Sequence, residues 1–306
     1  MSAAPAPTFA EERPVRAYFA LALGLLIIGF SAILMRRADA PGTVASFYRM
    51  SFGALFLAIP FARNLRKAFP LPRRAIWLAV LAGAFFGADL ASWTTGIMLS
   101  NATLPTLFAN TNPLWVGIGA WLIFKEQLSG KFWLGVLIAI GGAGIILGLG
   151  ESAGTALNEG ALYGALAGVF YGTYFLIAQK GRDVLDTTSF FWLGTLSSSV
   201  FLLIVNLVLG QPLTGFSSAS WQNFILQGLL IQAGGWFLII YAQGHLPASL
   251  VSPTLLGQPV LTAFLAGPLL GETLRPTDLI GGFAVIIGIL LVHRGQAEGR
   301  ARGRAI

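Results

Sequence analysis

The chain has 306 residues, of which 56% are hydrophobic and 10% are charged, and its formal net charge is +7. Soluble domains carry about 25% charged residues, so this composition excludes an ordinary water-soluble domain and indicates a polytopic membrane protein. There is no cysteine, which excludes disulfides and thiol-ligated metals, and His245 and His293 are too few and too far apart to suggest a metal site.

The chain begins with an Ala- and Pro-rich stretch, residues 1–16, which we predict to be a disordered cytoplasmic tail. An apolar run at about 17–35 predicts the first transmembrane helix. The alternative is a signal peptide, because Ala-Asp-Ala at 38–40 resembles a cleavage site. The run is longer than a usual signal core, however, and Pro41 would follow the cut.

Nine further apolar runs predict nine more transmembrane helices, because each has about 17–23 residues, enough to cross a bilayer core. The runs lie at about 43–62, 75–97, 102–124, 131–149, 160–180, 187–209, 221–243, 248–270 and 277–293. Their connections are too short for a soluble domain. We therefore predict an all-α membrane protein with ten transmembrane helices in two five-helix halves, 17–149 and 160–293, and a basic cytoplasmic tail at 294–306.

The second half repeats a motif of the first. Pro113 follows an asparagine and precedes Glu126, and Pro259 follows a glutamine and precedes Glu272 at the same spacing. The offset between the copies is 146 residues. Without a gap, the same offset pairs two sets of glycines, which are Gly135 with Gly281 and Gly142 with Gly288. We interpret this match as an internal duplication.

Each copy places a proline inside an apolar run. A proline removes a backbone donor and kinks a membrane helix, and a neighbour or a cavity satisfies the freed carbonyl. Proline-interrupted helices at matching positions of two halves point to the binding site of a transporter. The alternative is that Pro113 and Pro259 only bend their helices for packing.

The distribution of Lys and Arg predicts the orientation. With a cytoplasmic N-terminus, 15 of these residues fall on the cytoplasmic side and three, Arg36, Arg37 and Arg275, on the other. The positive-inside rule therefore places both termini in the cytoplasm, and it explains the positive charge without a nucleic-acid partner. Since each half has an odd number of helices, the halves are predicted to be inverted relative to each other, as alternating access requires.

Helix 160–180 carries a glycine at every fourth position, which predicts close approach of a neighbouring backbone. Two charged residues, Asp89 and Arg49, lie roughly 9–12 Å below the outer interface at 1.5 Å per residue. A charge at this depth needs a partner or a water-filled cavity. Three roles are open: an ion pair, a substrate or proton site at Asp89, or an Arg49 side chain that reaches the interface alone.

Polar and aromatic residues at mid-depth are predicted to line a central cavity. They offer neutral hydrogen bonds and flat apolar walls, which suit a small zwitterion or an aromatic solute. The candidate substrate-binding residues are Asp89, Trp93, Asn110, Asn112, Tyr171, Tyr174, Gln232, Trp236 and Gln258. For any single one of them, a hydrogen bond between helices is the alternative. The candidates for a structural or gating role are Arg49, Pro113, Pro259, Glu126 and Glu272.

Glu126 and Glu272 follow the ends of predicted helices, and we expect each either to cap the N-terminus of the next helix or to take part in gating. The sequence has no Gly-x-x-x-x-Gly-Lys-Ser/Thr, His-Glu-x-x-His or Gly-x-Ser-x-Gly motif. We therefore expect no enzyme activity, no metal and no cofactor, and only the lipid bilayer and a small-molecule substrate as partners.

The pattern that ends each half resembles the drug/metabolite transporter superfamily, EamA type. Its residues are Pro113, Glu126, Leu128, Gly135 and Gly142, and then Pro259, Glu272, Leu274, Gly281 and Gly288. Within this superfamily the chain resembles the YddG amino acid exporters. The resemblance implies a cavity between the halves and export of small solutes across the bacterial inner membrane. We expect alternating-access export of amino acids, aromatic ones among them, or of similar metabolites; the alternatives are a passive channel and a multidrug exporter.

Overall fold

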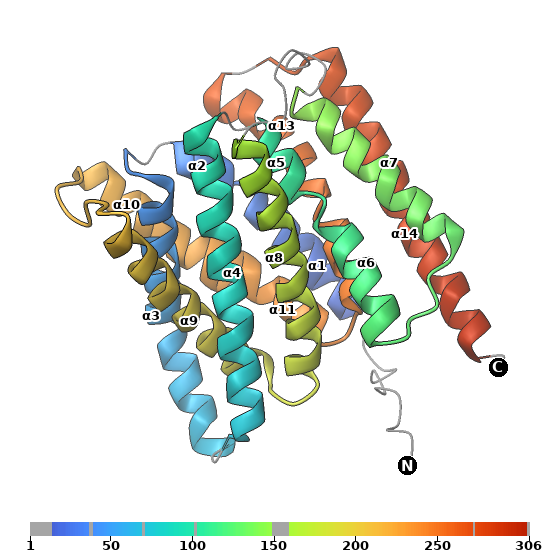
Figure 1. Cartoon of the computed structure of the whole chain (residues 1–306), viewed down its shortest axis with the longest axis horizontal. Helices are drawn as coiled ribbons and strands as arrows, with labels where there is room; N and C mark the ends of the chain where they lie inside the picture. The colour runs from blue at the N-terminus through green and yellow to red at the C-terminus, as the bar shows by residue number, and fades with distance from the viewer. Residues whose placement is uncertain are drawn as a thin grey trace.

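The computed structural model describes residues 14–36, 39–68, 71–100, 103–148, 159–271 and 273–304, and every regular element within these ranges is a helix (Figure 1). The helices are α1 (Pro14–Gly29), α2 (Ser31–Arg36), α3 (Gly42–Ala68), α4 (Arg73–Leu99), α5 (Thr103–Ala109), α6 (Asn112–Ile123), α7 (Gly130–Ile146), α8 (Glu159–Arg182), α9 (Thr187–Val208), α10 (Ser218–Leu226), the π-helix η1 (Gln227–Trp236), α11 (Phe237–Gln243), α12 (Ala248–Thr254), α13 (Gly257–Leu270) and α14 (Pro276–Arg304).

Within the described residues, seven helical stretches are long and apolar enough to cross a membrane. They are Gly42–Leu65, Arg73–Leu99, Glu159–Arg182, Thr187–Val208, Ser218–Gln243, Ala248–Ala266 and Pro276–Gly299, and the shorter stretches Val15–Gly29 and Gly130–Ile146 are also apolar. This architecture confirms the predicted all-α membrane protein, whereas the count of ten spans stays a prediction. The predicted N-terminal tail lies almost wholly outside the described residues, and residues 294–304, predicted as a tail, continue α14.

Two of the predicted helices are broken rather than kinked. Residues 110–111 separate α5 from α6, and residues 255–256 separate α12 from α13. Pro113 and Pro259 stand at the second and third positions of α6 and α13. A proline is tolerated there because the first amides of a helix have no intrahelical acceptor. Helix α6 starts at Asn112 and helix α13 starts at Gly257. The separation of these two residues agrees with the 146-residue offset of the duplication to within one residue.

Helices α7 and α14 pack side by side along their length (Figure 1), and the duplicated glycines lie between them. Gly135 faces Gly288, and Gly142 faces Gly281. A Cβ on any of the four would lie 2.6 Å from the carbonyl oxygen of the opposite glycine. Gly281 is the copy of Gly135, and Gly288 is the copy of Gly142, so each glycine of α7 contacts the copy of the other one and not its own. A twofold relation between two segments produces this crossed pattern.

The glycines of α8 lie against α5, α6 and the end of α4. A Cβ at Gly164 would lie 2.5 Å from the Cα of Pro105, and one at Gly168 would lie 2.6 Å from the carbonyl oxygen of Phe108. Only a residue without a side chain permits such a separation between helix axes. The close approach predicted from the four-residue spacing of these glycines is confirmed.

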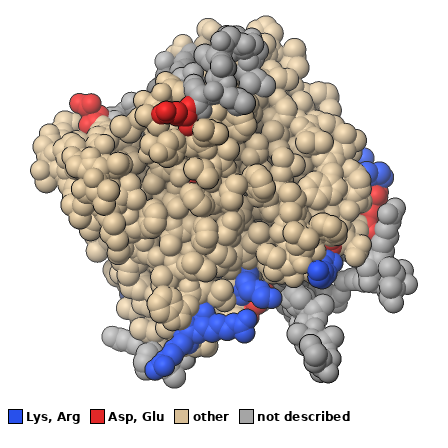
Figure 2. Space-filling view, viewed as in Figure 1, with Lys and Arg blue, Asp and Glu red and all other residues tan. Residues whose placement is uncertain are grey.

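On the face shown in Figure 2, the described Lys and Arg residues gather at one end of the molecule. Figure 2 shows them along the lower and right-hand margins of this face, which is the end that holds the α3–α4, α6–α7 and α8–α9 connections in Figure 1. The middle of the face carries almost only uncharged residues. An uncharged belt with a basic rim at one end is the surface expected of a protein that crosses a bilayer.

Candidate functional site: a cavity in the middle of the bundle

A cavity of about 1020 Å³ lies in the middle of the bundle. Its lining follows α4 from Phe86, halfway along the helix, to Met98 near its end, and it includes Thr103 at the start of α5 and Gly271 and Arg275 in the connection before α14. We call the end of the bundle that holds these three residues the mouth end. It lies opposite the basic end, because α4 runs from one end to the other (Figure 1).

The cavity brings together most of the predicted site residues. Those that line it are Arg49, Asp89, Trp93, Asn110, Tyr171, Trp236, Gln258 and Pro259. Three other substrate-binding candidates, Asn112, Tyr174 and Gln232, do not line it, and neither do the gating candidates Pro113 and Glu126. Glu272 lies outside the described residues. The substrate-binding roles of Asn112, Tyr174 and Gln232 stay predictions.

Arg49 and Asp89 face the cavity from α3 and α4, and their exposed fractions are only 4% and 6%. Within the described residues, neither side chain forms an ion pair or a hydrogen bond, and Nε of Arg49 is buried without a partner. The direct ion pair between them, one of the three expected roles, is therefore absent.

Three aromatic rings form one wall of the cavity. The ring centroids of Phe86 and Trp236 are 4.8 Å apart, and Tyr171 lies 5.9 Å from Trp236 and 6.2 Å from Phe86. Tyr174 was expected in this wall, but its ring stacks on Phe86 at 4.6 Å and is buried behind it. Its hydroxyl has no hydrogen-bond partner in the described part of the chain.

Asn112 and Gln232 bind other helices, which was the alternative for each. The Asn112 Oδ1 atom accepts a hydrogen bond of 2.5 Å from Ser252 Oγ, so it links the broken helices α5–α6 and α12–α13. The Gln232 Nε2 atom donates to Thr195 Oγ1 over 3.3 Å, and its side chain packs on Gly53. The predicted depth of a polar residue in the membrane does not separate a contact between helices from a position in the cavity lining.

Hydrogen bonds hold the cavity wall in place. Trp93 Nε1 donates to Thr106 Oγ1 over 2.9 Å, and Gln258 Nε2 donates to the carbonyl oxygen of Ile28 over 3.3 Å. Thr106 and Thr262 line the cavity as well, although we did not predict them. Thr106 occurs 13 residues after Trp93 on the next helix, and no sequence signal marks that pairing.

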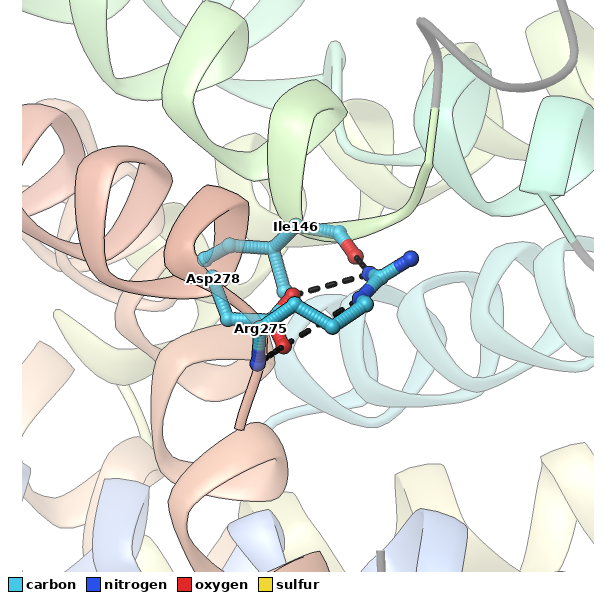
Figure 3. A network of polar contacts seen from close by, with 3 residues as sticks. All are labelled: Ile146, Arg275 and Asp278. Carbon is cyan, nitrogen blue, oxygen red and sulfur yellow. Dashed lines mark hydrogen bonds and ion pairs between the residues drawn. The ribbon is translucent and has the colours of Figure 1, made fainter. Parts of the chain in front are cut away.

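A clamp at the mouth end joins α7 to α14 (Figure 3). Nη2 of Arg275 donates to the carbonyl oxygen of Ile146 over 2.9 Å and to Oδ1 of Asp278 over 2.8 Å. The backbone amide of Arg275 donates to Oδ2 of Asp278 over 2.8 Å, which caps the start of α14. Arg275 and Asp278 both line the cavity, and we did not predict either as a site residue.

Glu126 occupies the opposite end and does not cap α7, which corrects the first of its expected roles. The cap of α7 is Ser129, whose side chain accepts from the amide of Phe132. The Glu126 carboxylate instead accepts hydrogen bonds from Gln179 of α8 at 3.3 Å, from Gln296 of α14 at 3.2 Å and from Ser249 of α12. We call this end the closed end.

The hydrogen bonds around Glu126 have a defined direction. Oε1 of Gln179 accepts from the amide of Ala248 over 2.6 Å, so its Nε2 group must point toward Glu126. Gln296 also donates to Ser249, whose hydroxyl donates to Glu126. The carboxylate is thus the common acceptor for three helices. Lys125, directly before it, has a φ of +58°, a left-handed conformation that turns the chain after α6.

Comparisons with known proteins were made for the whole chain. The EamA-like transporter family matches it twice, at residues 15–148 and 158–294. The chain is 31% identical over 281 residues to an uncharacterized protein of Pseudomonas aeruginosa, PA1977, with 88% of this chain and 92% of that one covered. It is also 26% identical over 278 residues to an uncharacterized transporter of Archaeoglobus fulgidus, with 90% of this chain and 95% of that one covered.

A more distant relative is the uncharacterized transporter YwfM of Bacillus subtilis, which is 22% identical over 260 residues, with 80% of this chain and 82% of that one covered. The structure also superimposes on a solved crystal structure with a TM-score of 0.77, covering 90% of this chain and 96% of the other. The sequence identity in that pair is 15%, so the likeness shows the fold alone.

Proposed function

Since the chain belongs to the EamA-like transporter family, we propose that it exports amino acids, aromatic ones among them, or similar small metabolites across the bacterial inner membrane. It is a multi-pass membrane protein, and its family and named relatives are transporters rather than enzymes. The substrate class, the direction of transport and the likeness to the YddG exporters belong to the proposal.

One observation carries the substrate proposal: a guanidinium and a carboxylate face one cavity and do not pair with each other. Unpaired buried charges are costly, so a ligand that compensates both is favoured. A zwitterion does this, because its carboxylate accepts from Arg49 while its ammonium group donates to Asp89. The wall formed by Phe86, Tyr171 and Trp236 suits a flat apolar side chain on the same molecule.

We propose alternating access between two inverted five-helix repeats as the mechanism. The matching breaks in α5–α6 and α12–α13 support this, because broken helices at corresponding positions of two repeats build transporter sites. The reciprocal glycine contacts between α7 and α14 support a twofold relation, as do the two family matches along the chain. Ten spans follow if α1 with α2, and α5 with α6, each cross the membrane once.

We propose that the basic end faces the cytoplasm, which follows from the positive-inside rule and the charges in Figure 2. The mouth then opens to the outside, and Glu126 with its three donors forms the gate that closes the cytoplasmic end. A cavity closed at one end supports a carrier over a passive channel. Counterflow in liposomes separates them, because external substrate accelerates efflux through a carrier and not through a channel.

The test of the substrate proposal is neutralisation of Asp89 and Arg49. Asp89→Asn removes a charged contact to the ammonium group, worth about 2–5 kcal/mol, and should lower counterflow of amino acids about a hundredfold. Arg49→Gln should have a similar effect, and the double variant should not recover activity. The matched control is Glu298→Gln, which removes a carboxylate from an exposed ion pair with Lys131 and should leave counterflow unchanged.

Recovery of flux and melting temperature together in the double variant would show that the two residues only balance each other's charge. A panel of amino acids and cationic drugs distinguishes the remaining candidates. Stimulation by drugs and not by amino acids would replace the amino acid exporter with a multidrug exporter.

A further inference from the structure

A second hollow, of about 1000 Å³, opens on the side of the bundle between α1–α2, α3 and η1. Leu229 and Leu230 of η1 line it with exposed fractions of 43% and 48%, and Leu269 of α13 lines it with 42%. These helices belong to the membrane-crossing part of the chain, since Gly42–Leu65 and Ser218–Gln243 are long and apolar enough to span a bilayer. The hollow therefore interrupts the surface that faces lipid.

The walls of the hollow offer only hydrocarbon contacts. Every described side chain that lines it is aliphatic, aromatic or proline, and none is charged or carries a hydrogen-bonding group. A polar ligand would lose its hydration there without compensation. Water is excluded for the same reason, because apolar cavities without polar partners stay dry. A hydrocarbon ligand fits these walls, and bilayer hydrocarbon is continuous with the opening.

Two irregular helices form the hollow and fix its position. One wall is the π-helix η1, a rare backbone form that is frequent at functional sites. The other contains Pro60, which lies inside α3. Gly234 of η1 borders open space. A Cβ at this position would meet only the carbonyl oxygen of Leu229, at 3.5 Å. A smooth lipid-facing helix pair would leave no such depression.

We propose that this hollow binds one acyl chain of a membrane phospholipid at a defined position. Ile33 lines both this hollow and the central cavity, and it is 4% exposed, so it acts as the partition between them. A bound acyl chain packs against the lipid side of this partition. Each methylene group that leaves mobile lipid for the hollow gains dispersion contacts with a fixed wall. The proposal does not depend on which solute the protein transports.

The experiment uses the full chain in nanodiscs that contain phosphatidylglycerol with a diazirine on one acyl chain. After irradiation, peptide mapping by mass spectrometry should find the label concentrated on η1 near Leu229 and Gly234 and on α3 near Pro60. Gly234→Leu fills part of the hollow and should abolish the excess of label on η1 and α3 over the rest of the helical belt, because its side chain takes the place of the acyl chain.

The matched control is Gly141→Leu, which adds the same side chain to another membrane helix glycine, at a site with no atom within 4 Å of its Cβ. Gly141→Leu should leave labelling of η1 and α3 unchanged. Uniform labelling around the whole helical belt of the unaltered protein would overturn the proposal, whether or not Gly234→Leu folds. Absence of lipid label from η1, together with cross-links between two protein copies from a photoreactive leucine at position 229, would overturn it in favour of a subunit interface.

Discussion

The two ends of the bundle are tied in different ways, although α7 and α14 reach both of them. At the mouth end, Arg275 joins the end of α7 to the start of α14. At the closed end, Glu126 also receives hydrogen bonds from Gln179 of α8 and Ser249 of α12. Helices α7 and α14 thus form a common support, and at the closed end hydrogen bonds from α8 and α12 add to it.

The largest effect is expected from a substitution in the contact between α7 and α14. Gly142→Ala places a Cβ 2.6 Å from the carbonyl oxygen of Gly281 and should destabilise the protein by about 3 kcal/mol. Gly141→Ala, one residue earlier, has no atom within 4 Å and should be neutral or stabilising by up to about 1 kcal/mol. Thermal unfolding of both variants in nanodiscs measures the difference. Equal melting temperatures would mean that α7 and α14 are not a tight pair.

Glu126→Gln should loosen the closed end alone. It replaces hydrogen bonds to a charged group, and a loss of about 2 kcal/mol is expected. In this cysteine-free chain, a single cysteine at Ala178, which is fully buried in α8, reports on the closed end. Its reaction with a thiol reagent should become roughly thirtyfold faster, in line with that free energy.

Glu298→Gln is the control for this change, because that carboxylate lies near the same end in an exposed pair with Lys131. It should not alter the reaction rate at position 178. An unchanged rate in Glu126→Gln as well would show that the hydrogen bonds of Glu126 do not keep this end closed.

Arg275→Gln at the mouth end should have the smallest effect. The Arg275 side chain is 40% exposed, and a partly exposed ion pair contributes about 0.5–1 kcal/mol. We expect a small fall in melting temperature and no change in the reaction of a cysteine at Ala178. A larger effect at position 178 than that of Glu126→Gln would contradict the separation of the two ends.

The sequence was informative where residues act locally. Proline and glycine constrain the backbone at their own positions. The interruptions near Pro113 and Pro259 were therefore predicted, although as kinks and not as breaks, and the close packing along α8 followed from the glycine spacing. Tyr171 and Tyr174 show the limit. They lie three residues apart on one helix, about 60° apart around its axis, and only the position of Phe86 on α4 decides which ring faces the cavity.

The partners of Glu126 could not be predicted for a related reason. Ser249 and Gln296 come 123 and 170 residues later in the chain, and neither belongs to a recognisable motif. Their positions depend on how whole helices cross. The π-helix η1 was missed as well, because its stretch of apolar residues and glycines reads like any other membrane helix.

The backbone at Lys125 adds an energetic consequence. A lysine with a φ of +58° is strained, and such strain persists only where surrounding contacts hold it. Here the contacts are those of the next residue, Glu126, so rupture of its hydrogen bonds would also release the strain. Lys125→Gly, which removes this strain, should stabilise the closed end by about 1 kcal/mol and slow the labelling of a cysteine at Ala178.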